Sequence, residues 1–465
     1  MKRKRLHRIL YWTAGAAALA IVGGPIAYQC LFPEPTRYAS DGEHFKYGSV
    51  GVEPASGMPF EVWRALPALC MSPADAKLGY RRFGFQWEPG RAAPIGMPLE
   101  TAIVPRVGIN CALCHVGRVE DDQGRARLLV GAPNTQLDIQ SYLRFLYGCA
   151  ASERFNADAI IDEIRRHRKL GFPKALFYRF VIIPQTRKQL LKQQREMAFM
   201  DGHPGWGPGR AAGFNPAKIQ ILKRPYDGTL DTVDFPSLWN MAARQPGGLH
   251  WDGVNSSLHE VFLNSGIGNG ANVRTLDHAS LNRNEAWARD FRPAAYPFAV
   301  DHAVAARGRP VFERTCAACH APGGAKVNQV IPLAWVGTDR NRLDAINEGV
   351  LQAFRDQFKD SLNYTHFRKT GGYVAATLDG IWARAPYLHN GSVPTLDALL
   401  RAPAQRPVQF RRASPRYDRQ RVGFAGDRGW VYDTRLPGNS AQGHLWGTDL
   451  AEPDRRALIE YLKTL

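Results

Sequence analysis

The sequence predicts a mainly α-helical protein with two units, long irregular excursions and one N-terminal transmembrane helix. Three observations lead to this fold class. A charge-free apolar run follows a basic block, segments with helical periodicity recur along the chain, and one short cysteine–histidine motif occurs twice. The 465 residues provide enough chain for two or three domains. With 45% hydrophobic and 22% charged residues, the composition is typical of globular proteins and excludes disordered or fibrous classes.

The N-terminus predicts an anchor and a location. Residues 1–8 are a basic block, and residues 9–32 contain no charged side chain. At about 1.5 Å per residue, this run can cross a hydrocarbon core about 30 Å thick. Because the basic flank stays in the cytoplasm, we predict a periplasmic body held in the inner membrane. A cleaved signal peptide is the alternative, since residues 18–20 (Ala-Leu-Ala) have the form of a cleavage site.

The net charge of +18 predicts an anionic partner or surface. Export makes nucleic acid an unsuitable partner, so we expect no contact with it. The remaining candidates are anionic lipid of the inner membrane and an acidic redox protein. The latter would be a periplasmic electron donor of the cytochrome or cupredoxin type.

Composition divides the rest of the chain into two units after the anchor at residues 1–32. Residues 33–290 form an N-terminal unit with loop-rich wrapping segments, because Gly, Pro and aromatic residues interrupt any sustained helical period before residue 110. Residues 300–465 form a C-terminal unit. It opens with a helical run and closes with a helix that has Pro453 in its first turn.

The motif Cys-x-x-Cys-His occurs at residues 111–115 and again at residues 316–320. This pattern attaches a c-type haem: the two thiols form thioethers, and the imidazole reaches the iron as an axial ligand. A dithiol does not need a histidine after each pair, and zinc would favour two more ligands at finger spacing. We therefore predict two covalent haems c in two cytochrome-c-like domains. The predicted attachment sites and proximal ligands are Cys111, Cys114, His115, Cys316, Cys319 and His320.

Two further cysteines are candidates for a structural bond. Cys70 and Cys149 could pair in an oxidising compartment. Two unrelated buried thiols are the alternative.

Other strings resemble a known family. PYLHNGSVPTL at residues 386–396 is similar to a signature of the bacterial di-haem cytochrome c peroxidases, a superfamily that includes the methylamine dehydrogenase maturation enzyme and the rubber oxygenases. HWDG at residues 250–253 resembles that family's FWDGR segment. NCALCHVG at residues 110–117 and VGAPNTQL at residues 130–137 resemble the rubber-oxygenase-like branch most closely.

The resemblance implies a division of labour between two haems. Peroxide or oxygen reacts at the N-terminal haem, the C-terminal haem passes electrons, and Trp251 lies between the irons. It also implies a calcium ion held by Asn240 and the main-chain carbonyls of Arg384 and Pro386, since oxygen-only ligation suits calcium. The alternatives are a packing role for Trp251 and a turn cap at Asn240.

The second axial ligand of the C-terminal haem is predicted to be a histidine. No methionine lies in the C-terminal unit, so this unit cannot supply the His/Met ligation of many family members. His444 falls where the resemblance places the distal ligand. We therefore predict the pair His320/His444, with His389 as runner-up. An ordinary surface or core histidine is the alternative for His444.

The family's usual acid/base residues are missing near the first haem. The resemblance places a Gln and a Glu where this chain has Val261 and Ala271. Glu260 is the candidate catalytic residue for the proton transfer that peroxide cleavage needs. An apolar pocket formed by Val261, Phe262 and Leu263 would instead suit dioxygen or an apolar substrate. The predicted function is a peroxidase-like oxidoreductase; the alternatives are an oxygenase acting on an apolar substrate and a pure electron-transfer cytochrome.

Overall fold

The computed structural model describes residues 36–100, 104–120, 123–414, 416–424 and 426–465. Of these residues, 43% are helical and 11% lie in strands. The prediction of a mainly α-helical fold was therefore wrong, because the described chain mixes helices and strands. Several excursions that we expected to be irregular pair instead as short antiparallel strands.

The predicted transmembrane helix falls on residues 1–32, which lie outside the described residues. Among the helices that the structure does describe, none is long and apolar enough to span a bilayer. The predicted periplasmic localisation with an inner-membrane anchor depended on that helix. This finding overturns the prediction, since the described chain gives it no support.

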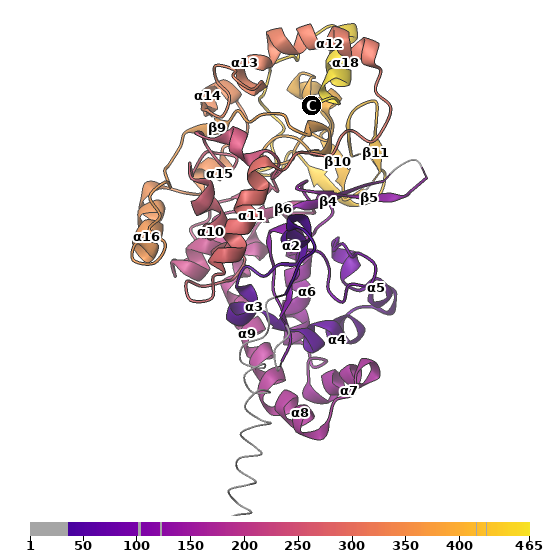
Figure 1. Ribbon diagram of the computed structural model, residues 1–465, viewed down its shortest axis with the longest axis vertical. Helices are drawn as coiled ribbons and strands as arrows, with labels where there is room; N and C mark the ends of the chain where they lie inside the picture. The colour runs from indigo at the N-terminus through magenta and orange to yellow at the C-terminus, as the bar shows by residue number, and fades with distance from the viewer. Residues whose placement is uncertain (1–35, 101–103, 121–122, 415, 425) are drawn as a thin grey trace, which may run out of the picture.

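The indigo to magenta part of Figure 1 is largely helical. Its helices are α2 (Asp41–Tyr47), α3 (Val52–Ser56), α4 (Phe60–Cys70), α5 (Pro73–Leu78), α6 (Ile139–Ala151), α7 (Ala157–His167), α8 (Phe172–Phe177) and α9 (Ile183–Glu196). The segment before residue 110 thus holds four helices where we expected loops. Three of them have seven residues or fewer, too few to show a sustained period, and side-chain caps at Ser40 and Ser72 start two of them.

Helices α4 and α6 are fixed to each other at their C-terminal ends. A disulfide joins Cys70 to Cys149, with the two Cα atoms 5.5 Å apart. In the core beside it, Trp63 stacks on Tyr80 at 4.0 Å between ring centres. The structure therefore selects the disulfide over two separate thiols. It joins two helices of the hydrophobic core that also contains Leu113 of the first motif.

Short strands and helices connect the two ends of the molecule. The three-stranded sheet has the order β1-β3-β2, and the other strands form two-stranded pairs. The first motif lies in the 3-10 turn η2 (Cys111–Leu113). The strands are β1 (Met58–Pro59), β2 (Leu99–Glu100), β3 (Arg106–Val107), β4 (Val116–Glu120) with β5 (Ala126–Val130), and β6 (Arg210–Ala212) with β7 (Thr232–Asp234). The turn η6 (Met241–Arg244) and helices α10 (Leu258–Gly268) and α11 (His278–Asp290) follow.

The orange and yellow elements at the top of Figure 1 carry the second motif. They are α12 (His302–Thr315), α13 (Ala317–His320), β8 (Val330–Pro332) with β9 (Gly372–Val374), α14 (Leu333–Val336), α15 (Asn341–Asp344), α16 (Glu348–Phe358), η7 (Ile381–Ala383), α17 (Leu396–Leu399), β10 (Gln409–Arg412) with β13 (Trp430–Asp433), β11 (Tyr417–Asp418) with β12 (Gly423–Phe424), and α18 (Glu452–Leu462). Helices α12 and α18 cross closely because Gly308 has no side chain: a Cβ there would lie 1.9 Å from the Ala457 carbonyl oxygen. This crossing positions the second motif at the end of α12.

Candidate haem centres

Both predicted proximal histidines are held by the same kind of contact. The Nδ1 of His115 donates to the Pro236 carbonyl at 2.8 Å, and the Nδ1 of His320 donates to the Ala376 carbonyl at 2.7 Å. This bond fixes the ring and leaves Nε2 to bind a metal. Burial lowers the pKa of His115 to about 4 and also lowers that of His320, so both rings are neutral, as iron ligation requires.

The four motif cysteines are free thiols inside helical turns, η2 in the first motif and α12–α13 in the second. Burial raises the pKa of Cys111 and of Cys316 to about 11, which keeps the free thiols protonated. In the described chain, no group of three or more His, Cys, Asp or Glu residues could hold a metal ion. The residues present therefore fit covalent haem better than zinc.

The segments that hold the two histidines repeat one layout. After Pro236 and after Ala376, the chain passes a left-handed residue (Asn240 or Gly380), a 3-10 turn and a cis proline (Pro246 or Pro386) at the same spacing. A β-bridge and a helix capped by Ser257 or Thr395 then follow in each. The two centres thus share one scaffold, and their differences lie in what faces each histidine.

His444 lies across from His320. The centres of the two rings are 6.3 Å apart, and the ring planes differ by 32°. Two imidazoles that bind one metal from opposite sides, each through a bond of about 2 Å, have ring centres about 6 Å apart. Burial lowers the pKa of His444 to about 4, and its Nδ1 has no hydrogen-bond partner in the described chain. The geometry suits a ligand pair.

His389, the runner-up, is engaged elsewhere. Its Nε2 lies 3.0 Å from the Tyr373 hydroxyl, and the two rings stack at 4.1 Å. The Tyr373 hydroxyl in turn donates its proton to the Asp339 carbonyl at 2.7 Å, so the His389 Nε2–H is the donor to the Tyr373 oxygen. The side chain is only 4% exposed. These contacts give His389 a structural role, because its ring is held by Tyr373.

Trp251 joins the segments that hold the two proximal histidines. Its indole Nε1 donates to the Asp234 carbonyl at 2.8 Å, two residues before Pro236. Its own carbonyl accepts from the Val374 N–H at 2.9 Å, two residues before Ala376. Trp251 is thus hydrogen-bonded to both β7 and β9. Strand β7 leads to the carbonyl that holds His115, and strand β9 leads to the carbonyl that holds His320.

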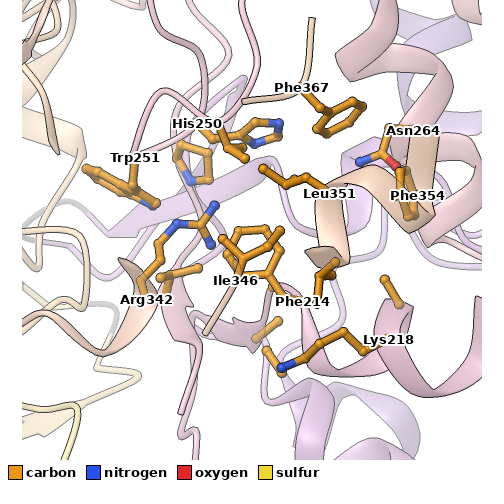
Figure 2. Close-up of a pocket in the computed structure, with 18 of the residues that line it drawn as sticks. Phe214, Lys218, His250, Trp251, Asn264, Arg342, Ile346, Leu351, Phe354 and Phe367 are labelled. Atoms are coloured by element: carbon orange, nitrogen blue, oxygen red, sulfur yellow. The ribbon is translucent and has the colours of Figure 1, made fainter. Parts of the chain in front are cut away.

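A pocket of about 190 Å³, part of whose lining is drawn in Figure 2, reaches Pro236, the residue whose carbonyl holds His115. Phe235 and Pro236 line it, and the Phe235 ring centre is 6.4 Å from that of His115. Most of the wall is apolar, with Trp251, His250 and the Arg342 guanidinium grouped on one side. Apolar lining residues include Phe214, Val254, Ile346, Leu351, Phe354 and Phe367. Val261, Phe262 and Leu263, which we expected to form an apolar pocket, do not line this one.

Sequence reasoning missed His250 and Arg342 as residues of this pocket. Burial and the nearby Arg342 charge lower the pKa of His250 to about 4, so the imidazole is neutral. The Arg342 guanidinium donates to Asp252 at 3.1 Å and lies over the Phe214 ring at 4.5 Å. His250 stood next to Trp251 in a recognised string, which was a usable signal. Nothing near Arg342 in the sequence pointed to the pocket.

Glu260 is placed away from the lining of the pocket. Its carboxylate accepts from the Thr365 N–H at 2.8 Å, from Asn255 at 3.0 Å and from the His366 ring at 2.7 Å. Burial alone would raise its pKa, but these hydrogen bonds lower it. The side chain therefore clamps α10 to the loop that follows α16, an arrangement that does not favour proton transfer at a haem.

The residues around Asn240 do not fit a calcium ion. The Asn240 amide donates to an Asp379 oxygen at 2.9 Å. The positive charges of Arg384 and Arg244 already act on the Asp379 carboxylate. A divalent cation would be placed next to two guanidinium groups, which opposes binding. We therefore derive nothing from calcium.

Comparisons with known proteins support part of the expected resemblance. Residues 372–411, which run from β9 through the His389 loop to β10, match the family described as RoxA-like, cytochrome c-like. The uncharacterised protein y4iM of Sinorhizobium fredii is 33% identical over 283 residues, 50% of this chain and 64% of its own length. The uncharacterised protein y4iJ of the same organism is 24% identical over 83% of this chain and 82% of its own length. The chain thus covers less than two thirds of y4iM.

The matched segment includes the Ala376 carbonyl that holds His320. A RoxA-like cytochrome c domain implies covalently bound haem c and indicates a haem-based oxidoreductase. It supports the rubber-oxygenase-like part of the resemblance and does not extend to the wider di-haem peroxidase superfamily.

Proposed function

We propose that this chain is a di-haem c-type oxidoreductase in which the haem at His115 reacts and the haem at His320 transfers electrons. One observation carries the proposal. His320 faces His444 at ligand distance, whereas an apolar pocket lies beside His115. Within the described residues, the aromatic ring that contacts His115 is that of Phe235, and the charge of His250, which lines the pocket, also acts on His115. When bound, haem supplies an iron that activates a small oxidant where its sixth position is free.

The lining of the pocket favours oxygenation of a small apolar substrate. A cavity of about 150 Å³ lined by apolar side chains stays dry and binds a ligand the size of benzene, and this pocket is slightly larger. Its aromatic and aliphatic side chains would hold the apolar part of such a substrate. His250 and Arg342 would orient a polar oxidant on the opposite side.

Peroxidase-like reduction of peroxide is the second candidate, and His250 favours it. This neutral imidazole faces the pocket and could accept a proton at its free ring nitrogen. The two electrons needed per peroxide would come from a donor protein of the cytochrome or cupredoxin type. They would enter at the His320 centre and reach the pocket through Trp251.

One experiment separates the two reactions. In the purified holoprotein we expect uptake of dioxygen with small apolar substrates, and Leu351→Trp should abolish it by filling the pocket. Leu78→Trp, at an exposed site on α5, is the matched control. If the wild type turned over peroxide and took up no dioxygen, and Leu351→Trp lost that turnover, the peroxidase would be established. Neither activity, with two haems that ignore small ligands, would refute both and leave an electron carrier.

A further inference from the structure

Two arginines occupy equivalent positions behind the two proximal histidines. Arg244 Nη2 donates to the Ser237 hydroxyl at 3.1 Å, and Ser237 follows Pro236. Arg384 Nη1 donates to the Thr377 carbonyl at 2.9 Å, and Thr377 follows Ala376. Each arginine therefore reaches back to the residue next to the carbonyl that holds its own histidine.

The two guanidinium groups share one counter-charge. Both act on the carboxylate of Asp379, so this cluster of two arginines and one aspartate has an excess positive charge. The Nε atoms of Arg244 and Arg384 are buried and have no hydrogen-bond partner in the described chain. Burial and the charge of Arg244 lower the pKa of Arg384 to about 9, which reflects the cost of the uncompensated charge.

Both arginine side chains are half-buried. Burial lowers the pKa of each, yet neither is fully excluded from solvent contact. Through Ser237 or Thr377, each arginine lies next to the carbonyl that holds the histidine of its own half.

An unpaired interior guanidinium is costly and calls for an anion, and its planar fork matches a carboxylate. The only carboxylates that covalent haem brings are its propionates. We infer that Arg244 and Arg384 form a repeated carboxylate site, in which each arginine binds a propionate of the haem attached in its own half. This inference rests on the proposed function, since it requires haem in both halves.

The test is the reduction potential of each haem in the purified holoprotein, measured at mildly alkaline pH where propionates are ionised. A nearby cation disfavours the ferric state, so Arg384→Gln should lower the potential of the His320 haem, and Arg244→Gln that of the His115 haem. A tenfold change in the one-electron equilibrium corresponds to about 59 mV, and we expect a shift of this size. The resonance Raman band of the propionate side chain should move in the same variants.

Two further variants serve as controls. Arg340→Gln removes an exposed arginine paired with Asp344 and should shift neither potential. Arg384→Lys keeps the charge and should retain most of the wild-type potential, which covers the case that the glutamine variant does not fold.

The outcomes distinguish this inference from the proposed function. Two haems whose potentials and propionate bands stay unchanged in the glutamine variants would overturn the propionate sites alone. The propionate sites would also be overturned if each glutamine variant shifted only the reduction potential of the haem in the other half. A wild-type chain that contains no haem would overturn the proposed function and this inference together.

Discussion

The two halves of the molecule hold a histidine in the same way and differ in what lies opposite it. In both, a main-chain carbonyl accepts from Nδ1, a cis proline follows at the same spacing, and a capped helix comes after it. At His320 the opposite position is taken by His444, whereas beside His115 there is an apolar pocket. A shared scaffold thus fixes where an iron would lie, and a few side chains decide whether it is closed or open.

The largest expected effect comes from removing one attachment site at a time. The variant Cys111→Ala/Cys114→Ala should lose one haem and all substrate oxidation, and Cys316→Ala/Cys319→Ala should lose the other haem. Intact mass and haem absorbance measure both results.

The disulfide cysteines provide the matched control for this experiment. Cys70→Ala/Cys149→Ala should keep two haems, although opening a cross-link between residues 79 positions apart should cost about 4 kcal/mol of unfolding free energy. Loss of a haem in this disulfide variant would contradict the account. So would a motif variant that keeps both haems, because each half would then not attach its own haem through its motif.

The second largest effect is expected at the His320 centre, where His444 lies across from His320. His444→Ala should convert the His320 haem from low-spin to high-spin and open it to ligands such as cyanide, since only one axial imidazole remains. Absorption and magnetic circular dichroism report the change. His302→Ala, at the start of α12, is the control. An unchanged low-spin spectrum would return His389 as the ligand.

A smaller effect is expected for the link between the halves. Trp251→Phe keeps an aromatic ring but loses the indole bond to Asp234. We expect electron transfer between the haems to slow roughly tenfold, about 1.4 kcal/mol in the barrier, with both spin states unchanged. Stopped-flow reduction measures the rate, and Trp335→Phe, at an exposed tryptophan, is the control. An unaltered rate would leave Trp251 a packing role.

The smallest effect on the haem centres is expected from Glu53, which lies behind the first motif. Burial raises the pKa of Glu53 to about 7. Because the folded chain holds this proton more tightly than the unfolded chain, stability should fall as pH rises from about 4.5 to 7, by on the order of 3 kcal/mol.

Glu53→Gln should remove most of this slope and leave both haem spectra unchanged. Denaturant unfolding at a series of pH values measures it. A variant with the same slope as the wild type would assign the pH dependence to other groups.

The site residues that sequence analysis could propose belong to local motifs. The two Cys-x-x-Cys-His strings are contiguous, and the resemblance pointed to His444 after the lack of methionine in the C-terminal unit had excluded His/Met ligation. The pocket could not be found in this way, because segments around Phe214, His250 and Arg342 meet only in the folded chain. Glu260 was chosen for its closeness to Trp251 in sequence, yet α10 turns it toward Thr365.

The misjudged fold class has a related cause. Strands of two to five residues, such as β4 and β5, leave too short an alternation to distinguish them from loops. The equivalence of Arg244 and Arg384 was also hidden, because it becomes visible only once Pro236 and Ala376 are known to bind the two histidines.

The most direct test of the account is the electron paramagnetic resonance spectrum of the resting ferric holoprotein. We predict one high-spin signal from the His115 haem and one low-spin signal from the His320 haem, with equal integrated intensity. Two low-spin signals, or two high-spin signals, would contradict a molecule with one open and one closed iron.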